Sequence, residues 1–259
     1  MAYSSAVFPS ETSSLEDGSR EKFDRLCRKL KLRSNDRVLE IGTGWGGFAV
    51  HAAQNYGCHV TTTTISNEQH EYTRDLIERL GLRDRIVLLK QDYRQLRGTF
   101  DKLVSIEMIE AVGYRYIPDF FKACCSLLAP HGLMALQGIT ISGQYYRRYI
   151  RSVDFIQQYI FPGSSLISLE NVLSAVNRVT DFQPVHLEDI TPHYARTLSI
   201  WKRNFLDRLD KVRELGFSEK FIRMWEYYLS YCEGGFRERF IGDVQLVMAR
   251  PGFSGVVTF

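Results

Sequence analysis

The residues most suited to hold a cofactor lie in the stretch 37–50, RVLEIGTGWGGFAV. A short apolar run at 38–41 leads into a cluster of glycines, and small apolar residues follow it. The pattern predicts a strand, a tight turn and the start of a helix. Glycine tolerates positive φ and leaves the main chain open to a ligand. The four glycines of the turn are Gly42, Gly44, Gly46 and Gly47.

The glycines alone leave two cofactor classes open, because similar turns hold the pyrophosphate of NAD. Glu40 lies just ahead of the first glycine. A carboxylate at this position would repel a phosphate and attract the α-ammonium group of S-adenosylmethionine. A plain strand-to-helix turn would not need four glycines in six residues. An acidic residue followed by Gly-x-Gly-x-Gly resembles the first motif of Rossmann-like methyltransferases, so we favour S-adenosylmethionine.

Bulk composition excludes several classes of function. The chain has 259 residues and a net charge of +3, from 33 basic and 30 acidic residues, which is too small to indicate a nucleic-acid partner. The five cysteines form no Cys-x-x-Cys pair, and no histidine has metal-ligand spacing, so we predict neither a disulfide framework nor a metal site. No signal-like segment and no apolar run of membrane-spanning length occurs, so we expect a cytoplasmic protein.

Strand and helix patterns alternate along the first part of the chain. Residues 1–18 are expected to be mostly coil. Strands are predicted at 38–41, 59–65, 85–91, 100–106 and 132–141, and helices at 21–30, 47–56, 67–80 and 116–128. This alternation favours a parallel sheet covered on both faces.

The pattern changes after residue 141. Helices are predicted at 144–160, 169–179, 193–215 and 217–231, with strands at 182–190 and 243–248. We interpret residues 142–180 as a cap inserted over the ligand-binding edge of the sheet. The whole chain, 1–259, is then one domain.

Six segments, taken in order, resemble those of a known family: LEIGTGWGGFA, TTTISNEQ, QDYR, SIEMIEAVG, DFIQQYIFPG and YYLSYCEGGFRERFIGDVQLV. They are similar to segments of cyclopropane fatty acid synthases and mycolic acid cyclopropane synthases, over residues 3–250. The resemblance implies an α/β, Rossmann-like class I methyltransferase domain, with a doubly wound, mostly parallel sheet and a helical cap insertion. It also implies that a methyl group passes from S-adenosylmethionine to the cis double bond of a phospholipid acyl chain, which forms a cyclopropane.

The resemblance further implies which residues contact the cofactor. Tyr3 and Ser4 match a Tyr-Ser pair that folds over it, and Asp92 matches the acidic residue that receives the adenine amino group. A turn or helix N-cap role for Asp92 stays open. The full set of implied cofactor residues is Tyr3, Ser4, Glu40, Gly42, Gly44, Thr64, Ile65, Gln69 and Asp92.

The implied reaction needs a base. An isolated double bond is a poor nucleophile, so methylation proceeds toward a carbocation, and a proton must then be removed in a dry, π-rich site. The resemblance implies a bound bicarbonate for this task. Gln137 stands where many members have His, Ser5 where Cys is usual, and Ala111 where His is frequent, but an amide and a backbone N–H can still donate. The implied bicarbonate residues are Ser5, Glu110, Gln137, Ile139 and Tyr194.

Two glutamates follow the predicted strand 100–106, at the edge where a parallel sheet presents side chains to its ligand. We expect Glu110 to lie in the site. We expect Glu107 to be solvated and Cys232 to have a packing role. The Tyr- and Arg-rich segment 144–151 fits either a lipid headgroup site at the inner face of the membrane or a solvated helical face, and both interpretations stay open.

Other functions also stay open: methylation without ring closure, N-methylation of an apolar amine, or a cofactor-binding relic without catalysis. Family members carry a segment ahead of the Tyr-Ser pair, whereas only Met1 and Ala2 precede it here. We therefore expect a weakly anchored cofactor cover, either because the chain is a shortened form or because another subunit supplies the lid. The expected partners are a second copy in a homodimer or a separate N-terminal partner.

Overall fold

The computed structural model describes residues 2–257, and within them one mixed sheet organises the chain. Its strand order is β3-β2-β1-β4-β5-β7-β6. The first five strands run parallel, and β7 is antiparallel to both of its neighbours, β5 and β6. The strands are β1 (Arg37–Ile41), β2 (His59–Thr64), β3 (Ile86–Lys90), β4 (Phe100–Ile106), β5 (Leu128–Ile141), β6 (Gln183–Asp189) and β7 (Ile241–Ala249).

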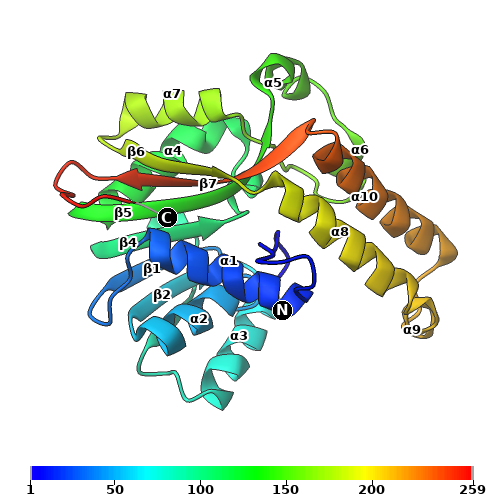
Figure 1. Cartoon of the computed structure of the whole chain (residues 1–259), viewed down its shortest axis with the longest axis horizontal. Coiled ribbons are helices and arrows are strands. Elements are labelled where there is room, and N and C mark those ends of the chain that lie inside the picture. Colours follow the sequence, from blue (N-terminus) through cyan, green and yellow to red (C-terminus); the bar gives the residue numbers. More distant parts are fainter. Residues whose placement is uncertain (1, 258–259) are drawn as a thin grey trace.

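Helices cover both faces of the sheet (Figure 1). Helices α1, α2 and α3 pack on one face, and α4 and α7 pack on the other. This doubly wound α/β arrangement confirms the predicted fold class. The helices are α1 (Leu15–Lys29), α2 (Gly47–Tyr56), α3 (Asn67–Arg79), α4 (Ile117–Leu127), α5 (Gly143–Tyr149), α6 (Phe155–Tyr159), α7 (Leu169–Val179), α8 (Thr191–Leu206), α9 (Leu209–Glu214) and α10 (Glu219–Arg237).

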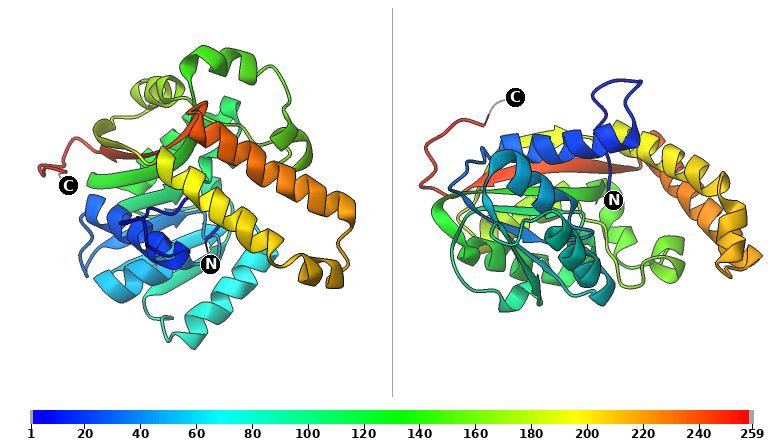
Figure 2. Two further views of the ribbon diagram at one scale, coloured as in Figure 1. Left: turned by 45° about the vertical axis from the view of Figure 1, so that its right-hand side comes forward. Right: turned by 90° about the horizontal axis from the view of Figure 1, so that it is seen from below.

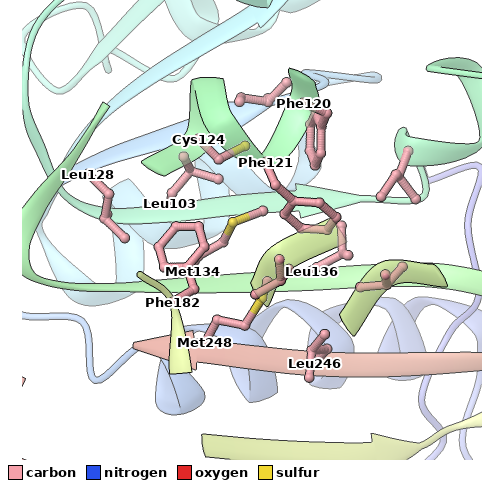
Figure 3. Close-up of a cluster of buried hydrophobic side chains, with 14 of the residues drawn as sticks. Leu103, Phe120, Phe121, Cys124, Leu128, Met134, Leu136, Phe182, Leu246 and Met248 are labelled. Carbon is pink, nitrogen blue, oxygen red and sulfur yellow. The ribbon is translucent and has the colours of Figure 1, made fainter. Parts of the chain in front are cut away.

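Strand alternation divides the core between the two faces. In β1, Leu39 and Ile41 join the cluster beneath α4, whereas Val38 joins the opposite cluster beneath α2. Successive side chains of a strand point to opposite faces, and a strand buried on both faces is therefore apolar throughout. Figure 3 shows the first cluster, in which Phe120 and Phe121 of α4 lie over the side chains of the central strands.

Helices α8 and α10 form an antiparallel pair joined by α9, and the pair extends beyond the end of the sheet (Figures 1 and 2). Aromatic side chains fill the space between them. The rings of Tyr194 and Phe236 stack with centroids 4.3 Å apart, and Leu198 and Tyr228 are buried in the same cluster. The pair forms a wall beside the carboxyl ends of the parallel strands.

Three predicted helix bounds are wrong, and capping residues explain two of them. Helix α1 begins at Leu15, inside the segment expected to be coil, because Ser14 and Asp17 form a capping box. The expected helix 144–160 is two short helices, because Asp154 caps α6 in the same way. The expected helix 193–215 is interrupted after Leu206, and α9 follows it.

The segment 142–180 has two parts. Helices α5 and α6 lie beside the α8–α10 pair, and the ring of Phe155 is 4.7 Å from that of Tyr227. Helix α7 instead packs on α4, and its Val172 and Val176 belong to the core under the sheet. The division of the chain at residues 142 and 180 stays a prediction.

We predict that Phe121→Ala lowers the free energy of unfolding by about 3–5 kcal/mol, because it removes a fully buried ring and leaves a cavity. Urea unfolding measures the change. Phe217→Ala is the matched control, since Phe217 is 46% exposed and its loss should change stability by no more than about 0.5 kcal/mol. Equal losses in both variants would contradict this account of the core.

Candidate active site

A cavity of about 690 Å³ lies at the carboxyl ends of β1 and β4, over the glycine turn. The indole of Trp45 and the rings of Trp201 and Trp225 contribute apolar walls. Of the residues predicted to contact the cofactor, those that line this cavity are Tyr3, Ser4, Glu40, Gly42, Gly44 and Gln69. Two thirds of the predicted set therefore surround one space.

The glycine turn has the backbone that its sequence predicts. Gly42 and Gly44 have φ of 103° and 53°, values that side-chain-bearing residues rarely adopt. A Cβ atom added at Gly44 would meet no atom within 4 Å, so the main chain there faces open space within the cavity. A ligand can therefore approach the backbone amides of the turn directly.

Glu40 lies at the floor of this cavity and is only 2% exposed. The Thr62 hydroxyl donates to Glu40 Oε2 at 2.6 Å. Burial raises the pKa of Glu40 to about 8, although the Thr62 hydrogen bond and the positive charge of Lys22 act to lower it. Near pH 7 the carboxyl group is therefore mostly protonated, and a cationic ligand would favour its ionised form.

Lys22 is a site residue that the sequence analysis missed. Its side chain is fully buried beneath the cavity, and its ammonium group donates to the Ser4 hydroxyl. Burial lowers the pKa of Lys22 to about 8, opposed by the nearby carboxyl groups of Glu107, Asp243 and Glu40. On the sequence, Lys22 lies among charged residues at the start of a predicted amphipathic helix, and nothing there marks it as buried.

Three predicted cofactor residues lie outside the lining of this cavity. The Thr64 hydroxyl donates to Gln69 Oε1 at 2.7 Å, and the Ile65 side chain is 77% exposed. Asp92 caps the short turn Tyr93–Gln95 and forms an ion pair with Arg94, the capping role that the sequence left open. Their contacts with a nucleoside stay predictions.

A second cavity, of about 1100 Å³, lies between the sheet edge, the loop 160–166 and the α8–α10 pair. Its walls are mainly apolar and aromatic, and include Ile156, Leu198 and Phe236. Tyr3, Gln69 and Glu107 line both cavities. The two spaces therefore meet at these three residues.

Glu107 is not a solvated surface residue, and the expectation from sequence is wrong here. The backbone N–H of Ser5 and the Gln137 amide both donate to Glu107 Oε1, at 2.8 and 2.7 Å. The Tyr194 hydroxyl donates to Oε2 at 2.7 Å. A carboxylate with three donors can stay ionised in a partly buried position, because the hydrogen bonds replace those of water.

Glu110 lines the second cavity. Its Oε1 accepts from the backbone N–H of Ile139 at 2.6 Å, while its Oε2 is buried and has no hydrogen-bond partner among residues 2–257. Burial, followed by the negative charge of Glu107, raises the pKa of Glu110 to about 8. This carboxyl group is therefore mostly neutral near pH 7.

The five positions implied for bicarbonate are brought together, but their donors are already in use. Ser5, Gln137 and Tyr194 donate to Glu107, and Ile139 donates to Glu110. Within the described residues, this arrangement leaves none of those four donors for a separate anion. The residues present do not fit a bound bicarbonate.

Asp243 completes the polar cluster, and it was not predicted. Asp243 Oδ2 accepts from the Gln137 amide at 3.1 Å, and its backbone pairs with Ile139 across β5 and β7. Burial, together with the negative charges of Glu107 and Glu110, raises the pKa of Asp243 well above its ordinary value. Only the antiparallel pairing of β7 brings this residue to the site, and that pairing has no local signal in the sequence.

The N-terminal residues are anchored, contrary to expectation. Ser5 and Ala6 are fully buried, and the backbone N–H of Ala6 donates to the Thr197 hydroxyl of α8 at 3.1 Å. The Tyr3 ring stacks on Trp201 with centroids 5.1 Å apart, and its hydroxyl is 2.9 Å from that of Tyr228. The helix pair α8–α10 therefore holds the cover that the sequence predicted to be loose.

Similarity to known proteins agrees with this arrangement. A family model described as mycolic acid cyclopropane synthetase matches residues 1–246. The chain belongs to this family. The match confirms the family predicted from the six sequence segments.

Relatives within and around the cyclopropane synthetase family share the sequence over most of this chain. It is 38% identical to a tuberculostearic acid methyltransferase of Mycobacterium tuberculosis, over 97% of this chain and 60% of the relative. It is 35% identical to the cyclopropane-fatty-acyl-phospholipid synthase of Escherichia coli K12, over 99% of this chain and 64% of the relative. The chain thus spans less than two thirds of the length of these curated relatives.

Solved structures of the family share the fold. A cyclopropane synthase from Mycobacterium tuberculosis matches with a TM-score of 0.89 at 26% identity, over 96% of this chain and 90% of that one. A mycolic acid cyclopropane synthase in complex with SAH and CTAB matches with a TM-score of 0.88, also at 26% identity, with the same coverage. The seven-stranded arrangement described above is therefore the fold of the cyclopropane synthetase family.

We predict that stability falls as pH rises from 5 to 8, and that Glu110→Gln flattens this slope. Glu110 keeps its proton in the folded chain up to a pKa of about 8, whereas the unfolded chain loses it near 4.5. The stabilisation is therefore complete below pH 4.5 and is lost as pH rises through about 8.

Urea unfolding at several pH values measures this slope. Glu71→Gln, on the exposed face of α3, is the matched control for the loss of one carboxyl group. A slope in Glu110→Gln equal to that of the unmodified chain would show that Glu110 is not held protonated.

Proposed function

We propose that the chain transfers the methyl group of S-adenosylmethionine to the cis double bond of an unsaturated phospholipid acyl chain and closes a cyclopropane ring. One observation carries the proposal: the first cavity, over the glycine turn, meets the second, mainly apolar cavity at Tyr3, Gln69 and Glu107. At this junction, a methyl donor bound in the first cavity can face an alkene bound in the second cavity. The family, and the cyclopropane-fatty-acyl-phospholipid synthase among the relatives, support the same reaction.

In the proposed complex the first cavity holds the donor, which supplies an electrophilic methyl group. The glycine turn offers backbone N–H groups to its carboxylate, and Glu40 receives its ammonium group. Tyr3 and Ser4 cover it. Thr64, Ile65 and Asp92 are the proposed contacts of the nucleoside, at the open edge beside β2 and β3.

The second cavity takes the acyl chain. Its aliphatic and aromatic walls exclude water, which protects a carbocation-like transition state, and its rings can stabilise the developing positive charge. Cys232 lines this cavity, and burial raises the pKa of its thiol to about 12, so it is a packing residue and not a nucleophile. No step is assigned to bicarbonate, because its donors are occupied.

The acyl chain of a phospholipid reaches the cavity from a membrane surface, so we also propose peripheral contact with the inner face of the membrane. Around the second cavity, Tyr145 of α5, Tyr159 and Phe161 are 40% or more exposed. Exposed aromatic rings of this kind settle at a lipid interface. No helix within residues 2–257 combines the length and apolarity that a membrane span requires. A homodimer remains part of the proposal.

Mass spectrometry of total fatty acids after expression tests the proposed reaction. We expect products that gain one CH₂ group and lose one unsaturation, which indicates a ring. A gain of CH₂ with retained unsaturation would indicate methylation without ring closure. Unchanged fatty acids in the expressing cells, together with donor binding by the purified chain, would contradict the proposed function.

We predict that Glu40→Gln weakens donor binding roughly tenfold or more, because a charge-assisted hydrogen bond is lost. Glu40, with its pKa of about 8, is mostly protonated near pH 7, and pairing with an ammonium group ionises it. Binding to the unmodified chain should therefore release a proton that Glu40→Gln does not release.

Calorimetry in two buffers with different heats of ionisation measures both the affinity and the proton release. Glu71→Gln again serves as the control. Identical affinity and proton release in the Glu40→Gln variant would remove Glu40 from the cofactor site.

A further inference from the structure

The Glu107 carboxylate occupies the point at which the donor cavity meets the acyl cavity. Glu107 follows β4 directly and has φ of 47°, in the left-handed region that non-glycine residues rarely adopt. Its backbone N–H donates to the carbonyl oxygen of Gln137 at 2.9 Å. The chain thus accepts an unfavourable backbone conformation to hold this side chain at the junction.

The groups around Glu107 form a binding site for a planar anion. A backbone N–H, an amide N–H and a phenol hydroxyl converge on its two oxygens from Ser5, Gln137 and Tyr194. These are three of the five positions at which the family resemblance implies bicarbonate. A carboxylate and bicarbonate share the same planar O–C–O group, so the side chain satisfies the same donors.

Two further acidic side chains share the space around Glu107. Glu110 and Asp243 face it, and the negative charge of Glu107 contributes to raising the pKa of both. Lys22 is the nearby cation, and Tyr194 is a hydrogen-bond donor. Repulsion between carboxyl groups that share one buried space favours the protonated forms of Glu110 and Asp243.

We propose that the Glu107 carboxylate is the base of the reaction and replaces bicarbonate in this chain. The inference rests on the proposed function for its substrate. In the step, the π electrons of the alkene form a bond to the transferred methyl carbon as the sulfur–carbon bond breaks, which leaves a carbocation on the acyl chain.

Proton removal completes the step. Glu107 takes one proton from the transferred methyl carbon, and the electron pair of that C–H bond closes the ring. The products are a cyclopropane, the demethylated donor and a protonated Glu107 that returns its proton to solvent. No oxidant, reductant or further reactant is needed.

Bicarbonate dependence distinguishes the two bases. We expect the unmodified chain to work at the same rate in carbon-dioxide-free buffer and with added bicarbonate. Glu107→Gly should lose about 10²-fold or more in rate and recover in part with bicarbonate or formate, because the vacated space fits a small anion. Glycine suits the positive φ of this position, so this variant should fold.

Glu107→Gln is the matched control for size. It fills the same space without a charge, so it should be as slow as Glu107→Gly and should not respond to either anion. Unmodified chain that slows when carbon dioxide is removed, or Glu107→Gln that keeps its rate, would overturn the proposal.

A binding measurement keeps the test independent of turnover. We expect ¹³C-labelled bicarbonate, followed by NMR, to bind to Glu107→Gly but not to the unmodified chain or to Glu107→Gln. Bicarbonate bound by the unmodified chain at this site would overturn the role of Glu107 even if no lipid were modified. If bicarbonate binds only to Glu107→Gly but the unmodified chain leaves fatty acids unchanged, the result would count against the proposed function and not against the fit of Glu107 to the anion site.

Discussion

The need to supply three hydrogen-bond donors to the Glu107 carboxyl group, at the junction of two largely apolar cavities, constrains the rest of this site. Burying an ion is costly unless hydrogen bonds replace its hydration. The donors to Glu107 come from three distant parts of the chain: the N-terminal segment through Ser5, β5 through Gln137 and α8 through Tyr194. Each of these elements must therefore reach its final position before the charge is satisfied. The anchored N-terminus and the helix pair follow from this requirement.

The same constraint divides the acidic residues by role. Glu110 and Asp243 are buried beside Glu107, and Glu40 is buried at the first cavity, and all three have a pKa raised by burial. Lys22, whose own pKa is lowered, is a cation that acts on both Glu40 and Asp243. The raised pKa values favour the protonated forms of these carboxyl groups. A cationic ligand in the first cavity would favour the ionised form of Glu40.

Local patterns predicted the fold well. The glycine turn with Glu40, the alternating strands and the two-sided apolar core each depend on neighbouring residues, and the structure has them where expected. The helix bounds that failed, at α1 and α6, depend on the side-chain caps of Ser14 and Asp154. Most predicted site residues also converge on the two cavities. Glu107 was misjudged because its partners lie 30 to 102 residues away in the sequence, a separation that no local pattern records.

The position of β7 has a consequence for how the chain is made. Strand β7 pairs with β5 on one side and with β6 on the other, so neither of these pairings can form before β7 has been synthesised. Until residues 241–249 leave the ribosome, both strands expose unpaired backbone edges that can associate with other chains. Synthesis is therefore vulnerable to aggregation until β7 emerges, and the carboxyl cluster assembles only when Asp243 arrives with that strand.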